Sequence, residues 1–146
     1  MADNSKDHAA QLINYLLKND SFSQWMGIKV MEADDGYCKL SCRITDNMLN
    51  GYGVTHGGIL FSLADTALAF AAASSGRVSL VVDHSISFTN SSKQSELITA
   101  EASIEHQSHK LSVGTVKISD KTGRTLCVTK GTIYKKTESI DISNQQ

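Results

Sequence analysis

The chain has 146 residues, of which 40% are hydrophobic, and its 14 basic and 15 acidic residues give a formal net charge of −1. This length suits one domain with a core of its own. The balanced charge excludes the positive field that gathers nucleic acid or anionic membranes. The polar first ten residues show no leader pattern, so we expect a cytoplasmic protein whose partners are small molecules or copies of itself.

The N-terminal part of the chain predicts a short amphipathic helix. Residues 1–8 are polar and are expected to fray, whereas apolar residues recur at helical spacing from Ala9 to Leu17. A helical turn over 22–26 then closes one end of the core. We therefore expect an N-terminal segment at 1–21, one domain over 22–136, and a polar, disordered tail at 137–146.

The hydrophobic period changes to two from Ile28 onward, which indicates β-strands. Gly114 marks a change of apolar phase and predicts a bulge, and residues 120–123 have the composition of a hairpin turn. Cysteines without metal-ligand spacing are expected to be reduced thiols in or near the core: Cys38, Cys42 and Cys127. The expected strands cover residues 37–44, 79–88, 97–105, 110–119 and 125–136.

One long apolar helix is expected over about residues 57–76. Between His56 and Arg77 every residue is small, aliphatic, aromatic or hydroxylic except Asp65. A helix that is apolar on all sides belongs in an interior, where a carboxylate is costly unless it is paired, hydrogen-bonded or used. Nothing obvious in the sequence pairs with Asp65. The helix and five to six mostly antiparallel strands predict an α+β fold, with a curved sheet wrapped around the helix.

The start of this helix and its one carboxylate suggest acyl-transfer chemistry. The first N–H groups of a helix lack acceptors, so Gly57 and Gly58 can bind an oxygen that gains negative charge. Asp65 can be the base or the nucleophile. Eight residues of helix separate Gly57 from Asp65 by roughly 12 Å, whereas a base must lie within about 3 Å of its proton. Two copies packed antiparallel would bring them together, which predicts a dimer with shared sites.

Simpler interpretations of these residues remain open. His56 and the two glycines also suit a tight turn, and an aspartate in a helix is often a hydrogen-bonded structural group. Asn50 is by default a turn residue, although its amide can also hold Asp65 or a water molecule. The neighbours Asp83 and His84 lie on an expected strand and point to opposite faces, so they are not expected to act as a couple.

Three motifs resemble the hotdog-fold acyl-CoA thioesterases of the PaaI type, which belong to phenylacetate metabolism. The motifs are Met-Leu-Asn-Gly at 48–51, His-Gly-Gly at 56–58 and Phe-Ser-Leu-Ala-Asp-Thr-Ala at 61–67. The likeness extends over roughly residues 22–136. It implies a hotdog fold and hydrolysis of a coenzyme A thioester of an aryl or medium-chain acid. It further implies no metal or cofactor, and dimers that commonly pair into tetramers.

The resemblance also implies roles for individual residues. Asp65 would activate water or attack the thioester, Gly57 of the facing subunit would donate its N–H, and His56 would polarise the carbonyl. Asn50 would position Asp65 or the water. Gly58, Phe61 and Leu68 are expected to contact the substrate. Lys93 and Lys110 are weaker candidates for contacts with the coenzyme A phosphates, since exposed lysines are usually only solvated.

Two departures from the family pattern concern the segment after the helix. Val81 stands where some relatives carry a serine that holds the water. Residues 89–93 read Thr-Asn-Ser-Ser-Lys where relatives often have a proline and then a basic residue. At these positions the chain therefore lacks the serine that holds the water and the basic residue that lies near the coenzyme A phosphates in those relatives.

Two other functions compete with hydrolysis. A hotdog dehydratase would pair a histidine with an acid in a different arrangement. A non-catalytic acyl-CoA-binding module, as a sensor or scaffold, would not need Asp65. A sensor would also be expected to carry a DNA-binding segment, and residues 1–25 are too few and not basic enough for one.

Overall fold

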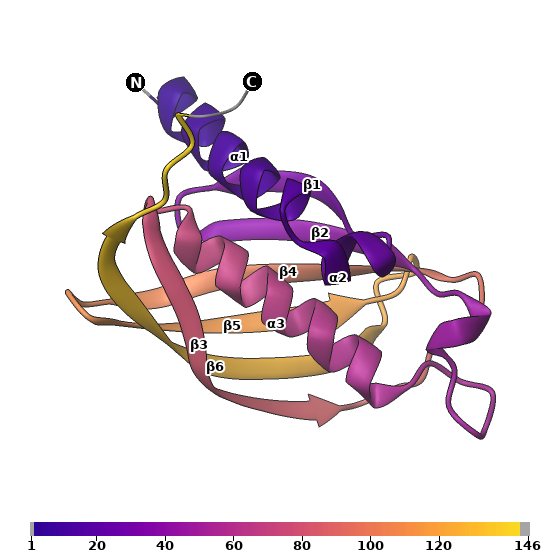
Figure 1. Ribbon diagram of the computed structural model, residues 1–146. Helices are drawn as coiled ribbons and strands as arrows, with labels where there is room; N and C mark the ends of the chain where they lie inside the picture. The colour runs from indigo at the N-terminus through magenta and orange to yellow at the C-terminus, as the bar shows by residue number, and fades with distance from the viewer. Residues whose placement is uncertain (1, 144–146) are drawn as a thin grey trace.

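The computed structural model describes residues 2–143, which form a six-stranded antiparallel sheet curved around one long helix (Figure 1). The helices are α1 (Ala2–Lys18), α2 (Ser21–Trp25) and α3 (Gly57–Ala73), with a 3-10 turn at Asp46–Met48. The strands are β1 (Lys29–Asp34), β2 (Tyr37–Arg43), β3 (Arg77–Phe88), β4 (Leu97–Gln107), β5 (Leu111–Ser119) and β6 (Thr125–Ser139). The α+β architecture expected from the periodicities is confirmed, with β1 as the sixth strand.

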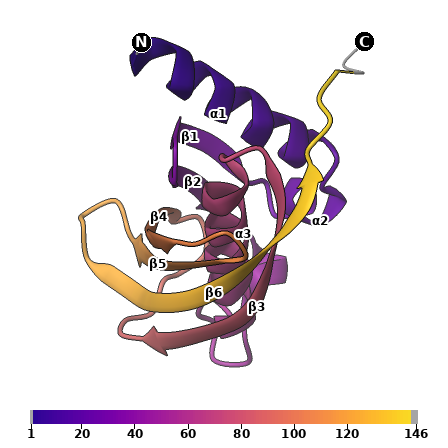
Figure 2. The same ribbon diagram turned by 90° about the vertical axis from the view of Figure 1, so that its left-hand side faces the viewer.

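The strands lie in the order β1-β2-β4-β5-β6-β3, so the strand that follows α3 is an edge of the sheet. Figure 2 shows α3 inside the curl of the sheet, with α1 lying across β1. β3 runs back beside α3 and pairs on its other side with β6. This return places residues of β3 next to residues of α3 that are far from them in sequence.

Both ends of the described chain are more regular than expected. α1 begins at Ala2, so residues 2–8 are helical, because Ala9, Leu12 and Ile13 bury one face of α1, while the polar residues from Asn4 to His8 lie exposed to solvent. The expected disordered tail is a strand as far as Ser139, which pairs with Arg77. Residues 144–146 of that tail lie outside the described residues.

The bulge predicted at Gly114 lies on the facing strand instead. Gly114 pairs with Ile104 and Val113 pairs with His106, so Glu105 of β4 is the extra residue. The inward alternation of β5 continues through Gly114. The predicted turn at 120–123 is confirmed, since the Asp120 carboxylate accepts hydrogen bonds from the backbone N–H groups of Thr122 and Arg124.

Two paired glycines bring α3 close to the sheet. Gly114 of β5 lies opposite Gly131 of β6, and the fully buried Leu68 of α3 packs on both. A Cβ atom on Gly114 would lie 2.6 Å from Leu68 Cδ1, and one on Gly131 would lie 2.5 Å from Leu68 Cδ2. Since real Cβ atoms do not approach other atoms so closely, glycine at both positions sets the distance between the helix and the sheet.

The cysteines are buried thiols, as expected. Burial raises the pKa of Cys42 and of Cys127 to about 11 and the pKa of Cys38 to about 12. Such thiols stay protonated near neutral pH and are poor nucleophiles.

In the described part of the chain, no helix combines the length and apolarity needed to cross a membrane.

Candidate active site

One face of α3 is open to solvent, because the sheet covers only the inward side of the helix. Asp65 lies in the middle of this stripe, and its side chain is 45% exposed. The expectation of a carboxylate buried on all sides is therefore wrong. The partly exposed residues at helical spacing are Gly58, Phe61, Ser62, Asp65, Thr66 and Ala69, which we call the α3 stripe.

Asp65 has a partner that the sequence reasoning missed. His84 of β3 places its Nδ1 atom 3.2 Å from Asp65 Oδ1 and its Nε2 atom 2.9 Å from Thr129 Oγ1 of β6. Only 4% of the His84 side chain is exposed, and its ring centroid lies 5.0 Å from that of Phe61. Asp83, by contrast, is exposed, so the prediction that these neighbours point apart is confirmed. A histidine on the inward face of the strand after the helix was the available signal.

The two glycines at the start of α3 are not equivalent. His56 caps the helix, because its Nδ1 atom accepts a hydrogen bond of 2.8 Å from the Gly58 N–H. Among the described residues, none accepts from the Gly57 N–H. A Cβ atom on Gly57 would lie 3.1 Å from Cζ of Phe88. The free donor that an oxyanion could use is therefore Gly57, and Gly58 is committed to the cap.

Asn50 and Leu68 both have structural tasks within the single chain. Asn50 Oδ1 accepts hydrogen bonds from the N–H groups of Tyr52 at 2.9 Å and Val54 at 3.3 Å, so it shapes the loop before α3. The Asn50 side-chain amide N–H groups point to no acceptor among the described residues. Leu68 is fully buried against the paired glycines, which leaves it no exposed surface with which to contact a substrate.

The two candidate lysines lie at opposite ends of α3. Lys93 follows Ser92, whose backbone oxygen accepts a 2.9 Å hydrogen bond from the N–H of Thr55, just before α3 begins. Lys110 lies in the turn that packs against Arg77, where β3 starts after the C-terminal end of α3. The structure therefore brings only Lys93 close to the free Gly57 N–H. Both lysines are exposed.

An apolar cavity of about 420 Å³ opens between α1, α3 and β3. Ala69 and Ala73 line it, and Ala69 lies one helical turn beyond Asp65 on the α3 stripe. Its other principal walls are Leu16, Phe70 and Leu80. The cavity is thus a largely apolar space that begins one helical turn beyond Asp65, which does not itself line it.

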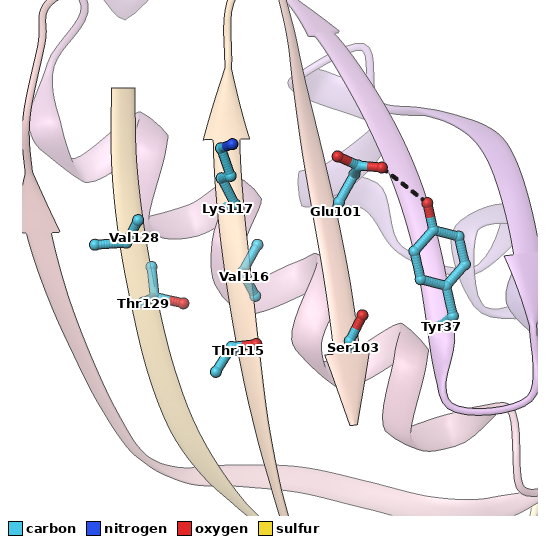
Figure 3. Close-up of a pocket in the computed structure, with 8 residues that line it drawn as sticks. All are labelled: Tyr37, Glu101, Ser103, Thr115, Val116, Lys117, Val128 and Thr129. Atoms are coloured by element: carbon cyan, nitrogen blue, oxygen red, sulfur yellow. Dashed lines mark hydrogen bonds between the residues drawn. The ribbon is translucent and has the colours of Figure 1, made fainter. Parts of the chain in front are cut away.

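A second hollow, of about 430 Å³, lies on the sheet face opposite to α3 (Figure 3). There the Tyr37 hydroxyl donates to Glu101 at 3.0 Å, and burial together with this carboxylate raises the pKa of Tyr37 above its ordinary value. The thickness of the sheet separates this hollow from Asp65. Among residues 2–143, no three His, Cys, Asp or Glu side chains lie close enough together to hold a metal ion.

Residues 52–135 match the model of the thioesterase superfamily. The chain belongs to this superfamily. It is 31% identical over 127 residues to the acyl-coenzyme A thioesterase PaaI of Escherichia coli K12, a match that covers 87% of this chain and 91% of the relative. The structure of the E. coli PaaI protein from the phenylacetic acid degradation operon superposes with a TM-score of 0.91 and 29% identity, over 93% of this chain and 99% of that one.

A hypothetical thioesterase protein of Streptococcus pneumoniae TIGR4, solved with coenzyme A, is also similar. Its TM-score is 0.74 and its identity 25%, over 78% of this chain and 91% of that one. The protein is therefore a PaaI-type thioester hydrolase with the hotdog fold, as the resemblance implied.

Proposed function

We propose that this thioesterase hydrolyses acyl-CoA thioesters to the free acid and coenzyme A, with Asp65 as the reacting carboxylate. The observation that carries the proposal is the half-exposed carboxylate of Asp65, to which His84 makes a hydrogen bond. This carboxylate lies on the same helix as the free N–H of Gly57. The similarity to an acyl-CoA thioesterase and to a coenzyme A complex supports this choice of thioester.

The chemistry follows from the charges that develop. As general base, Asp65 takes a proton from a water molecule whose oxygen attacks the thioester carbon; as nucleophile, it attacks that carbon itself. The carbonyl oxygen becomes negative and accepts from the Gly57 N–H. The carbon–sulfur bond then breaks, and the leaving sulfur takes the proton held by Asp65, or one from water, to give coenzyme A. In the nucleophilic route, water then hydrolyses the anhydride between Asp65 and the acyl group, which releases the free acid and restores the carboxylate. In this proposal His56 turns its Nε2–H toward the same carbonyl, and the Asn50 amide holds the water or Asp65.

A second copy of the chain completes the site in this proposal. β3 is an open edge of twelve residues, on which Leu80 is 50% exposed and Val82 62% exposed. Such an edge is a template for pairing with another strand. Two copies joined along β3 would cover these side chains together with the α3 stripe. Gly57 of one copy would then reach Asp65 of the other, and such dimers could pair further into a tetramer.

The cavity next to Asp65 suggests the size of the acyl group. Apolar walls favour an apolar group, and a space of about 420 Å³ lies at the low end of the range for ligand pockets. We therefore propose an aryl or medium-chain acyl group for this cavity. Exposed Lys93 would meet a phosphate of coenzyme A near the start of α3, and Lys110 remains a weaker candidate for the same contact.

A panel of acyl-CoA thioesters tests this function. Release of the thiol should be faster with phenylacetyl, hexanoyl and octanoyl groups than with acetyl or palmitoyl groups, because acetyl leaves the cavity empty and palmitoyl exceeds it. Since the competing dehydratase also pairs a histidine with an acid, 3-hydroxybutyryl-CoA should be included, and no loss of water is expected from it. Failure to hydrolyse any thioester of the panel would refute the proposed substrate class.

Shared sites can be tested with two inactive variants. Gly57→Pro removes the N–H at the first helical position, where proline is tolerated, but its ring also brings side-chain atoms close to Phe88. The extended His56 backbone suits a following proline. Mixing Gly57→Pro chains with Asp65→Asn chains should restore activity, because about one site in four then combines an intact Gly57 with an intact Asp65. Gly57→Ala keeps the N–H and controls for crowding against Phe88.

The measurement needs proof that subunits exchange, for example native mass spectrometry of differently tagged chains. No recovery of thiol release in exchanged mixtures would place Gly57 and Asp65 of one site in the same chain and would refute the shared site.

A further inference from the structure

We infer that His84 is a positioning residue, which holds Asp65 Oδ1 so that the second carboxylate oxygen faces the reacting water or thioester. This inference rests on the proposed function of Asp65. A carboxylate on a long exposed helix face can rotate about its side-chain bonds, whereas a hydrogen bond of 3.2 Å to a buried ring selects one orientation. His84 itself is only 4% exposed and does not reach the solvent side of the site.

The His84 ring is fixed from three sides. Its Nε2 atom lies 2.9 Å from Thr129 Oγ1, and the Phe61 ring packs against it at a centroid distance of 5.0 Å. On the third side, a Cβ atom at Gly131 would lie only 3.2 Å from His84 Cδ2. The missing side chain at Gly131 thus leaves room for Leu68 and for the imidazole ring. A ring held in this way fixes the position of the Asp65 carboxylate relative to the sheet.

The relative exposure of Asp65 and Thr129 excludes a triad in which Thr129 is the nucleophile. An acid, a histidine and a hydroxyl in a row also occur in hydrolases in which the hydroxyl attacks the substrate and the acid lies behind it. Here the acid is 45% exposed, while Thr129 is 6% exposed at the inner end of the row. The group open to a substrate is therefore Asp65, and Thr129 anchors His84.

The hydrogen bonds also assign the ring protons. A carboxylate only accepts, so His84 Nδ1 carries a proton, while the Thr129 hydroxyl can either donate to Nε2 or accept from it. His56 has the opposite form, because its Nδ1 atom accepts from the Gly58 N–H and its proton lies on Nε2. Nδ1 is thus expected to be protonated in His84 and unprotonated in His56.

Two amide variants separate positioning from packing. In His84→Asn the amide N–H lies where Nδ1 was and can still donate to Asp65, whereas in His84→Gln it reaches toward Thr129 and leaves Asp65 free. We expect kcat to fall about 10–100-fold in His84→Gln, with KM unchanged, and by less than about fivefold in His84→Asn. Thr129→Val, which removes the anchor, should lie between them.

Equal kcat values for the two amide variants would overturn the inference, and so would a Thr129→Val enzyme as inactive as Asp65→Asn, which would make Thr129 the nucleophile. Thermal melting of each variant shows whether it folds. Wild type that hydrolyses no acyl-CoA would refute the proposed function instead.

A measurement without substrate tests the contact itself. In ¹⁵N–¹H spectra of the histidine rings, His84 Nδ1 of the wild type should be protonated and should shift in Asp65→Asn, while His56 Nδ1 should be unprotonated. An unprotonated His84 Nδ1 would overturn the inference, whether or not any variant folds.

Discussion

Asp65→Asn is expected to lower kcat for acyl-CoA hydrolysis by about 10²–10⁴-fold, the range associated with loss of a general acid or base. The amide keeps the size of the carboxylate and still accepts from His84 Nδ1 through its oxygen. It cannot take a proton from water and is a poor nucleophile. Since the backbone of α3 and its cap at His56 are unaffected, the loss should appear in kcat and leave KM nearly unchanged.

Asp83→Asn is the matched control for this experiment. It makes the same chemical change one residue from His84, but Asp83 is exposed and lies on the other side of β3. The kcat values of the two variants, measured by steady-state thiol release, should therefore differ by the same factor of about 10²–10⁴. If Asp65→Asn keeps more than about a tenth of wild-type kcat, a hundredfold effect is excluded and Asp65 is not the reacting carboxylate.

Gly131→Ala is expected to lower the free energy of unfolding by about 1–3 kcal/mol or more, as overpacking of a core does. The new Cβ atom would lie 2.5 Å from Leu68 Cδ2 and 2.9 Å from the backbone oxygen of Asp83. Leu68 is fully buried in the core and has little room to move, and the Asp83 oxygen moves only with β3. Urea denaturation compared with wild type measures the effect.

Two further variants test whether overpacking causes the loss of stability in Gly131→Ala. Gly51→Ala adds the same methyl group where nothing lies within 4 Å, so it should unfold within about 0.5 kcal/mol of wild type. In the background of Leu68→Ala, Gly131→Ala should cost less, because the shortest of its three close contacts is gone. An unchanged midpoint in Gly131→Ala, equal to that of Gly51→Ala, would contradict the packing of α3 on the paired glycines.

Local features of the chain were predictable wherever they depend on neighbours in sequence. The period of two in the strands and the apolar run of α3 follow from which side chains alternate or recur, and these signals located most elements within a few residues. Residues close together in the sequence also determine the start of α3 at Gly57, the distance from Gly57 to Asp65 and the turn at 120–123. The motif around Asp65 was sufficient to indicate a thioesterase, which the comparisons confirm.

The contacts that complete the site depend on how distant segments meet, and the tertiary structure alone decided them. Asp65 and His84 are 19 residues apart and meet because β3 returns beside α3. Thr129 joins them because β6 pairs with β3, and Leu68 is removed from the candidate contacts because two glycines of different strands pair beneath it. By itself, the sequence determined the helix, its start at Gly57 and its carboxylate. The partner of that carboxylate followed from strand order and register, which no local pattern encodes.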